Sequence, residues 1–185
     1  MDTAALGDAG RRLTARADDG TLYIMTRPSD VPTYVEAGAA DVGIVGKDVL
    51  LEHEPDVYEL CDLAFGHCHM AYATLAGDDP TPGVLARLGT VRVATKYPRV
   101  ALAHFEATGR QAEVVKVNGS VELAPLVELA HGIVDLVATG ATMRENGLVE
   151  REHLFDSSAR LIANRASDKV AGPAVDRLMA SLEPS

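Results

Sequence analysis

Aromatic residues are scarce in this chain of 185 residues, which contains no Trp, three Phe and five Tyr. Because bases need aromatic faces to stack on, binding of single-stranded nucleic acid is excluded as its main role. Basic residues are also few: 17 Lys and Arg stand against 27 Asp and Glu, and the formal net charge is −10. This balance argues against nucleic acid or an anionic membrane as a partner. Any anionic ligand must be held by local groups.

Cysteine and long apolar runs are also scarce. The two cysteines, Cys61 and Cys68, form no CxxC motif and are interpreted as reduced thiols. The best apolar stretch, residues 133–138, is interrupted by Asp135 and falls far short of the ~18 residues of a membrane span. The opening residues MDTAALGDAG lack the features of a secretory signal. We therefore expect a cytoplasmic protein without a membrane span.

Short β-branched runs alternate with helical stretches, which is typical of an α/β protein with mostly parallel sheets. We expect helices from Ser29 or Asp30 to Ala37, from Pro98 to Gly109 and from about Ser120 to Ala130. The expected strands are residues 21–27, 41–46, 57–65, 69–76, 91–95, 113–117, 133–138 and 159–164.

Two features predict two similar lobes. The segment 77–83, GDDPTPG, concentrates turn-forming residues between two apolar runs and is interpreted as a lobe boundary. Residues 41–46 and 135–140 each form a strand that begins at aspartate and ends in a glycine turn, so the two turns could face one cleft. Strands 69–76 and 159–164 could cross between the lobes. We therefore predict a discontinuous lobe I, residues 1–76 plus 157–185, and a lobe II, residues 77–156.

The segment 135–148, DLVATGATMRENGL, is the most informative for function. A buried strand leads through Thr139 and Gly140 directly into a helix start, where the amides of Gly140, Ala141 and Thr142 can converge on an anion. Glycine lets a ligand approach the backbone closely. The missing Lys of a GxxxxGK[ST] loop excludes the usual nucleoside triphosphatase motif. The alternative is an ordinary strand-to-helix turn with Thr142 as N-cap.

Asp135 needs a separate interpretation, because a carboxylate repels phosphate. The same group can accept hydrogen bonds from the vicinal hydroxyls of a sugar or meet a magnesium-bound water. A phosphate-binding turn beside such an aspartate suggests a phosphoribosyl ligand.

Several other residues could contact that ligand or could be structural. Arg27 ends a strand before Pro28, where its guanidinium could clamp phosphate oxygens or pair with a surface carboxylate. Gly46 precedes a second helix start, at which Lys47 could touch ligand and Asp48 is more typical of a cap.

Lys96 and Glu122 are two further candidates. Lys96 follows a strand, where it could meet a polyphosphate or remain solvated. Glu122 could bind sugar hydroxyls, or it could complement a helix that Ser120 caps.

The HCH sequence at 67–69 suggests a metal site only superficially. In a strand His67 and His69 would share one face and Cys68 the other, and no further ligand cluster follows nearby. Two ligands do not make a site, so no metal-binding residue is assigned. A nucleophile elbow, GxSxG, is also absent.

The chain resembles the short form of ATP phosphoribosyltransferase, the enzyme that opens histidine biosynthesis. The resemblance extends over roughly residues 2–183 and rests on five strings: RPSDVPTYVEAGAADVGIVGKDVLLE, LAFGHCHM, VRVATKYPRVA, NGSVELAPLVELAHGIVDLVATGATMRENGL and LIANRAS. It implies a two-lobed, periplasmic-binding-protein-like (type II) α/β fold with the active site in the cleft.

The resemblance also implies a reaction, in which N1 of ATP displaces pyrophosphate, accompanied by Mg²⁺, from phosphoribosyl pyrophosphate. The family's phosphoribosyl-binding motif matches Asp135 through Thr142, which places the Thr139–Thr142 turn at the 5′-phosphate and Asp135 at the ribose. An arginine at the pyrophosphate end matches Arg27, and Lys96 is our second catalytic candidate. Glu122 and Gly46 are candidate ribose or nucleotide contacts.

Relatives usually begin with a strand and a Lys-Gly-Arg turn, whereas Met1 falls within the helix that follows, so we expect the usual first strand to be lacking. The short-form resemblance further implies a catalytic homodimer within a hetero-oligomer that contains a histidyl-tRNA-synthetase-like regulatory subunit. The alternative functions are a non-catalytic module that binds small anions and an inactive paralogue.

Overall fold

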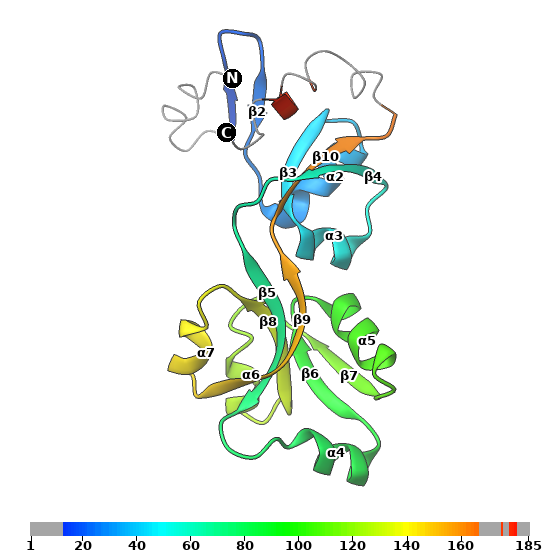
Figure 1. Cartoon of the computed structure of the whole chain (residues 1–185), viewed down its shortest axis with the longest axis vertical. Helices are drawn as coiled ribbons and strands as arrows, with labels where there is room; N and C mark the ends of the chain where they lie inside the picture. The colour runs from blue at the N-terminus through cyan, green and yellow to red at the C-terminus, as the bar shows by residue number, and fades with distance from the viewer. Residues whose placement is uncertain (1–12, 167–174, 176–177, 181–185) are drawn as a thin grey trace. The chain divides into compact units, whose positions relative to one another are not determined.

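The computed structural model describes residues 13–166, 175 and 178–180. The chain divides into two compact units, one of residues 1–50, 54–65 and 159–185 and the other of residues 51–53 and 66–158 (Figure 1). The first unit is discontinuous in sequence, as predicted. The prediction of a missing first strand concerns residues before 13, which lie outside the described residues.

Unit 1 is built on a three-stranded antiparallel sheet in the order β3 (Val42–Gly46), β10 (Ala159–Asn164), β4 (Val57–Asp62). The short helix η1 (Pro28–Asp30) leads into α2 (Val31–Glu36), and α3 (Lys47–His53) follows β3. A separate hairpin pairs β1 (Thr14–Arg16) with β2 (Leu22–Ile24).

Close contact between α2 and the sheet depends on Gly43. A Cβ at Gly43 would lie 2.7 Å from Val31 Cγ1 and 2.8 Å from Val35 Cγ2, so a larger residue would push the helix away. Asn164 Nδ2 donates to the Val35 and Glu36 carbonyls at 2.6 and 3.0 Å and so satisfies the end of α2. The last residue of β10 thereby fixes a helix almost 130 positions earlier in the chain.

Unit 2 contains a five-stranded sheet in the order β7 (Ala112–Lys116), β6 (Val91–Thr95), β8 (Gly132–Val137), β5 (Cys68–Leu75), β9 (Leu148–Ser157). Strand β6 runs parallel to β7 and β8, whereas β5 runs antiparallel to β8 and β9. The helices are α4 (Thr81–Leu88), α5 (Pro98–Ala107), α6 (Leu123–Leu126) and α7 (Ala141–Glu145).

The sheet of unit 2 has two different faces, because alternate residues of β5 point in opposite directions. Met70 and Tyr72 enter a core with Val100 and Phe105 of α5. Ala71 and Ala73 enter the other core, whose members include Met143 of α7. Small residues therefore line the face on which α6 and α7 lie.

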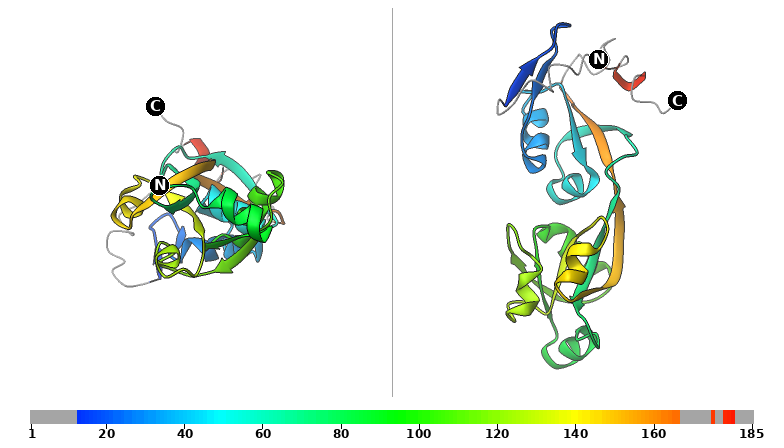
Figure 2. Two further views of the ribbon diagram at one scale, coloured as in Figure 1. Left: turned by 90° about the horizontal axis from the view of Figure 1, so that it is seen from below. Right: turned by 90° about the vertical axis from the view of Figure 1, so that its left-hand side faces the viewer.

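Three predictions about the fold were wrong. The expected boundary after residue 76 lies instead after residue 65, because strand β5 finds both of its neighbours in the sheet of unit 2. The second boundary lies after residue 158 rather than 156. The sheets are not mostly parallel: in the described part of the chain only β6 forms parallel pairs. Strands β5 and β9, which run side by side, account for much of this difference (Figure 2).

The predicted helix from Ser120 to Ala130 was also wrong. Ser120 has a φ of +46° and therefore cannot be the N-cap, and α6 spans only Leu123–Leu126. Pro125 removes a backbone donor within this segment, and Glu128, with a φ of +59°, turns the chain away from helical geometry.

Candidate functional site

The turn between β8 and α7 leads from a buried strand through Gly140 directly into a helix, as the sequence predicts. Gly140 is the N-cap of α7 with φ +70° and ψ +6°, a conformation that glycine adopts without strain. Thr142 lies inside the helix rather than at its cap, so the alternative of an ordinary Thr142-capped turn is wrong. The amides of a first helical turn have no acceptor within the helix. Here the Ala141 amide donates to Thr139 Oγ1 at 3.4 Å.

A pocket of about 180 Å³ lies at this turn. It brings together the five residues predicted to bind the phosphoribosyl group and adds Glu122 from the segment before α6. The lining residues are Glu122, Asp135, Leu136, Val137, Ala138, Thr139, Gly140, Ala141, Thr142 and Met143.

Asp135 is the buried carboxylate of this pocket, with 8% of its surface exposed. It lies on β8 opposite Ala71, so its side chain leaves the sheet on the small-residue face. Burial raises the pKa of Asp135, while the Lys96 ammonium and the Leu136 amide oppose that shift and the nearby Glu122 adds to it. Among the described residues its Oδ1 has no hydrogen-bond partner. A charged group that is kept buried although burial disfavours its ionised form is typical of a functional site.

Lys96 supplies the nearest positive charge. Its Nζ lies 3.6 Å from Asp135 Oδ1, and its side chain is 42% exposed. The turn after β6 holds Lys96 in place, because Thr95 Oγ1 accepts a 2.8 Å hydrogen bond from the Tyr97 amide. A cation thus lies beside a carboxylate that lines the pocket, an arrangement that suits recognition of a polyphosphate and a sugar.

Arg144 is a pocket neighbour that the sequence analysis missed. Its Nη1 lies 3.0 Å from the position that a Cβ on Gly140 would occupy, so the guanidinium lies against the turn. The side chain is exposed on α7. The sequence could have indicated this contact, because Arg144 follows Gly140 by four residues, which is about one helical turn.

Arg27 and Gly46 belong to unit 1, and their roles in a shared site stay predictions. Arg27 is exposed and directly precedes the turn of η1, as expected. The prediction that it ends a strand was wrong, because β2 ends at Ile24. Gly46 is the N-cap of α3, where a Cβ would clash with the Asp48 carboxylate. Lys47 Nζ pairs with Glu59 Oε2 at 2.6 Å, which favours a structural role for this lysine.

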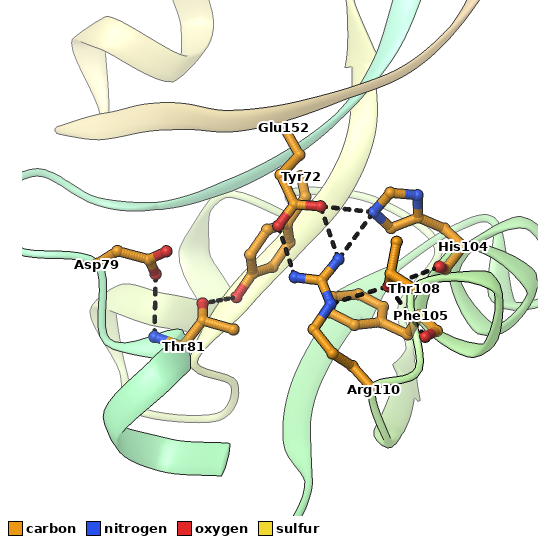
Figure 3. A network of polar contacts seen from close by, with 8 residues as sticks. All are labelled: Tyr72, Asp79, Thr81, His104, Phe105, Thr108, Arg110 and Glu152. Atoms are coloured by element: carbon orange, nitrogen blue, oxygen red, sulfur yellow. Dashed lines mark hydrogen bonds and ion pairs between the residues drawn. The ribbon is translucent and has the colours of Figure 1, made fainter. Parts of the chain in front are cut away.

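A second polar network lies on the opposite face of the unit 2 sheet (Figure 3). Arg110 donates to both oxygens of Glu152 at 2.6 and 2.7 Å, and the Nε2 of His104 lies 2.7 Å from Glu152. The hydrogen bond from Arg110 is the main cause that lowers the pKa of Glu152. The guanidinium also lies 4.6 Å from the centre of the Phe105 ring. Every member has a partner, so this network stabilises unit 2 rather than receiving a ligand.

Tyr72 completes the network from the core side. Its hydroxyl lies 2.8 Å from Thr81 Oγ1, and burial raises its pKa to about 12. The bond ties the start of α4 to the sheet. Asp79 Oδ1 in turn accepts from the Thr81 amide at 2.9 Å.

In the part of the chain that the structure describes, no helix is long and apolar enough to span a bilayer. Neither Cys61 nor Cys68 is part of a disulfide.

Comparisons with solved structures establish the fold. The ATP phosphoribosyl transferase (HisG:HisZ) complex from Thermotoga maritima contains a chain that matches with a TM-score of 0.81 and 30% identity, over 97% of this chain and 89% of that one. A periplasmic binding protein from Brucella ovis matches with a TM-score of 0.51 and 10% identity, over 85% and 60% of the two chains. The second likeness concerns the fold alone and confirms the periplasmic-binding-protein-like architecture.

Comparisons of sequence establish the family. The family model "HisG: ATP phosphoribosyltransferase" matches residues 27–184. The ATP phosphoribosyltransferase of Rubrobacter xylanophilus is 52% identical over 183 residues, which cover 98% of this chain and 84% of the relative. The chain therefore belongs to the ATP phosphoribosyltransferase family, whose members are the transferases of the first step of histidine biosynthesis.

Proposed function

We propose that the pocket of unit 2 binds the phosphoribosyl group of phosphoribosyl pyrophosphate during the transfer reaction of this family. The observation that supports this most is Asp135, a buried carboxylate whose Oδ1 has no hydrogen-bond partner among the described residues. Two neighbouring ribose hydroxyls are donors that would satisfy it.

The turn from Thr139 to Thr142 would hold the 5′-phosphate. Gly140 exposes the backbone there, and the hydroxyls of Thr139 and Thr142 add two further donors. The geometry supports direct amide contacts more than a helix dipole, because α7 spans only five residues. Arg144 would add a charge-assisted contact from the side of the helix.

The reaction needs no covalent nucleophile on the protein. N1 of the adenine donates an electron pair to the anomeric carbon, the bond between that carbon and the pyrophosphate oxygen breaks, and pyrophosphate leaves with the bonding pair. Positive charge develops on the ribose in the transition state, where the negative charge of Asp135 would stabilise it. Holding the two substrates in line is the other large contribution.

Lys96 and Arg27 would bind the leaving group. Lys96 lies 3.6 Å from Asp135, which fits a cation placed between the ribose and the pyrophosphate. Arg27 is exposed in unit 1 and could bind phosphate oxygens bidentately. Both side chains would balance the charge that accumulates on pyrophosphate.

Mg²⁺ is the metal that we assign to this reaction, and the donor set fits it. Asp135 and Glu122 offer carboxylate oxygens at one pocket, and hard oxygen donors are the ligands that Mg²⁺ prefers, often through water. When bound with the substrate, the ion would neutralise charge on the pyrophosphate. Glu122 and Asp135 would then position its waters.

A regulatory partner is supported by the solved HisG:HisZ complex of the Thermotoga maritima relative. We propose that this chain likewise works as a catalytic homodimer in a hetero-oligomer with a histidyl-tRNA-synthetase-like subunit. We assign the enzyme to the cytoplasm, where ATP is available and where cysteines such as Cys61 and Cys68 stay outside disulfides.

The direct test is formation of phosphoribosyl-ATP from ATP, phosphoribosyl pyrophosphate and Mg²⁺, with and without the regulatory partner. Product in either condition supports the proposal. Substrate binding without product in both conditions, from protein with a cooperative unfolding transition, would favour the alternative of a non-catalytic anion-binding module.

A further inference from the structure

Two histidines and a glutamate meet on the outer strands of the unit 2 sheet. His69 comes from β5, and Glu150 and His153 come from β9. One potential ligand atom from each of the three lies within 4.8 Å of the others. None of the three lines the pocket around Asp135.

Two β-bulges place these side chains together. Regular alternation along β9 would put Glu150 and His153 on opposite faces of the sheet. The register between β5 and β9 instead shifts twice, between Met70 and Ala71 and between Tyr72 and Ala73. Ala73 therefore pairs with Glu150, Ala71 with His153 and His69 with Asp156, so three β9 residues face the same side as His69. Bulges that re-aim side chains are typical of functional positions.

The contacts of the cluster already approach those of a metal site. His69 Nε2 lies 2.9 Å from Glu150 Oε2, and the rings of His69 and His153 stack with centroids 4.9 Å apart. His153 Nε2 lies 3.3 Å from Asp156 Oδ1. A carboxylate beside a ligating imidazole is the usual arrangement around a metal-bound histidine.

We propose that His69, Glu150 and His153 form a binding site for a divalent transition-metal ion of the zinc class. Two imidazoles and one carboxylate are a common three-ligand set for Zn²⁺, with a fourth position left to water or another oxygen. Metal–ligand bonds of about 2.0–2.2 Å would need side-chain rotations that bring the three ligand atoms, now within 4.8 Å of one another, around one ion. Glu150 and His153 are exposed and His69 is half-buried, so such rotations are sterically open. Imidazole ligands favour Zn²⁺ over Mg²⁺, which separates this site chemically from the substrate pocket.

The site is nevertheless adjacent to the pocket on the sheet. Ala71 pairs with Asp135 on one side and with His153 on the other, and all three side chains share one face. Two strand spacings of about 4.8 Å put the backbones of Asp135 and His153 roughly 10 Å apart.

Cobalt binding gives the sharpest test. The purified, chelator-treated full chain is titrated with Co²⁺ in buffer without Mg²⁺ or substrates, and the visible absorption of the bound ion is followed. We expect saturation at one ion per chain and displacement of Co²⁺ by Zn²⁺. The His69→Gln and His153→Gln variants should each weaken binding at least about tenfold.

The matched control is His53→Gln, which alters an exposed histidine at the end of α3, outside the cluster. It should leave the titration unchanged. Thermal unfolding of each metal-free variant shows whether it folds. Zn²⁺ should raise the melting temperature of the unaltered chain and of His53→Gln by the same amount, and that of the His69 and His153 variants by less. The proposal would be overturned if the unaltered chain failed to saturate with Co²⁺. It would also be overturned if the double variant, with both His69→Gln and His153→Gln, bound Co²⁺ as tightly as the unaltered chain. Because no substrate is present, neither result depends on the transferase activity.

Discussion

Lys96 Nζ lies 3.6 Å from Oδ1 of Asp135, a buried carboxylate that lines the same pocket as the turn from Thr139 to Thr142. The distance is longer than a hydrogen bond, so the lysine offsets the buried charge without satisfying the oxygen. Asp135 Oδ1 is therefore left without a hydrogen-bond partner among the described residues, and the Lys96 ammonium lies beside it. We regard this relationship as the centre of the proposed site.

Asp135→Asn should lower kcat/KM on the order of a hundredfold, because the variant loses the negative charge that faces the developing positive ribose. The free energy of unfolding of the Asp135→Asn variant should not fall. The raised pKa of Asp135 means that the folded chain holds this proton more tightly than the unfolded chain, so ionisation at neutral pH costs stability. Urea denaturation at pH 7 should therefore show Asp135→Asn to be at least as stable as the unaltered chain.

The stability difference between these two proteins should narrow as the pH falls toward the ordinary pKa of 3.8, because Asp135 then becomes protonated and uncharged. Asp78→Asn, at an exposed aspartate, is the control and should change neither stability nor activity appreciably. A strongly destabilised Asp135→Asn chain would mean that the carboxylate is a structural element.

Gly140→Ala and Gly147→Ala form a matched pair at the two ends of α7. The two glycines have φ of +70° and +67°, so each alanine should cost about 1–2 kcal/mol of stability. Only the new Cβ at position 140 meets a neighbour, Arg144 Nη1 at 3.0 Å; at 147 nothing lies within 4 Å. Calorimetry should show weaker binding of phosphoribosyl pyrophosphate for Gly140→Ala alone. If both substitutions weakened the binding of phosphoribosyl pyrophosphate equally, the loss would reflect destabilisation of the fold in general.

Glu152→Gln should destabilise unit 2 at neutral pH by about 1–2 kcal/mol, because it weakens the paired hydrogen bonds from Arg110 in a partly screened position. The pKa of Glu152 is lowered in the folded state, so its contribution is present above the ordinary value of 4.5 and is lost as the pH falls below it. Denaturation curves at pH 7 and pH 3.5 should show the variant approaching the unaltered chain at the lower pH.

The control for Glu152 is Glu113→Gln, at an exposed carboxylate that lies 3.2 Å from Arg92. An exposed pair of this kind contributes little, so the effect should stay below about 0.5 kcal/mol. If the two variants lost the same stability at pH 7, the network would be no stronger than a surface ion pair.

The local pattern predicted the elements of the sheets well where a strand is buried on both faces. Residues 133–138 were expected as a strand and form β8 at Gly132–Val137, since continuous apolar character identifies such a strand. The turn at Gly140 was also predictable, because glycine readily adopts the positive φ that a tight turn before a helix can require.

Strand β9 could not be predicted from its own residues. Leu148–Ser157 is rich in charged side chains, and its two bulges break the alternation that identifies an edge strand. This also explains why His69 appeared to lack further metal ligands: Glu150 and His153 are more than 80 residues away and reach it only through pairing of β9 with β5.

The error at residues 77–83 has a similar origin. The turn-forming composition there does mark a real turn, between β5 and α4, but composition cannot show which sheet a strand joins. Strand pairing over long sequence distances determines the division into units, and that information is not local.

The central claim is that the turn from Thr139 to Thr142 binds the phosphoribosyl end of phosphoribosyl pyrophosphate. Thr142→Ala tests it most directly, with separate calorimetric titrations of phosphoribosyl pyrophosphate and of ATP into the same folded preparation with Mg²⁺. Loss of one hydroxyl contact to a charged group should weaken phosphoribosyl pyrophosphate binding on the order of tenfold and leave ATP binding unchanged. Equal losses for both ligands, or a loss confined to ATP, would contradict the account.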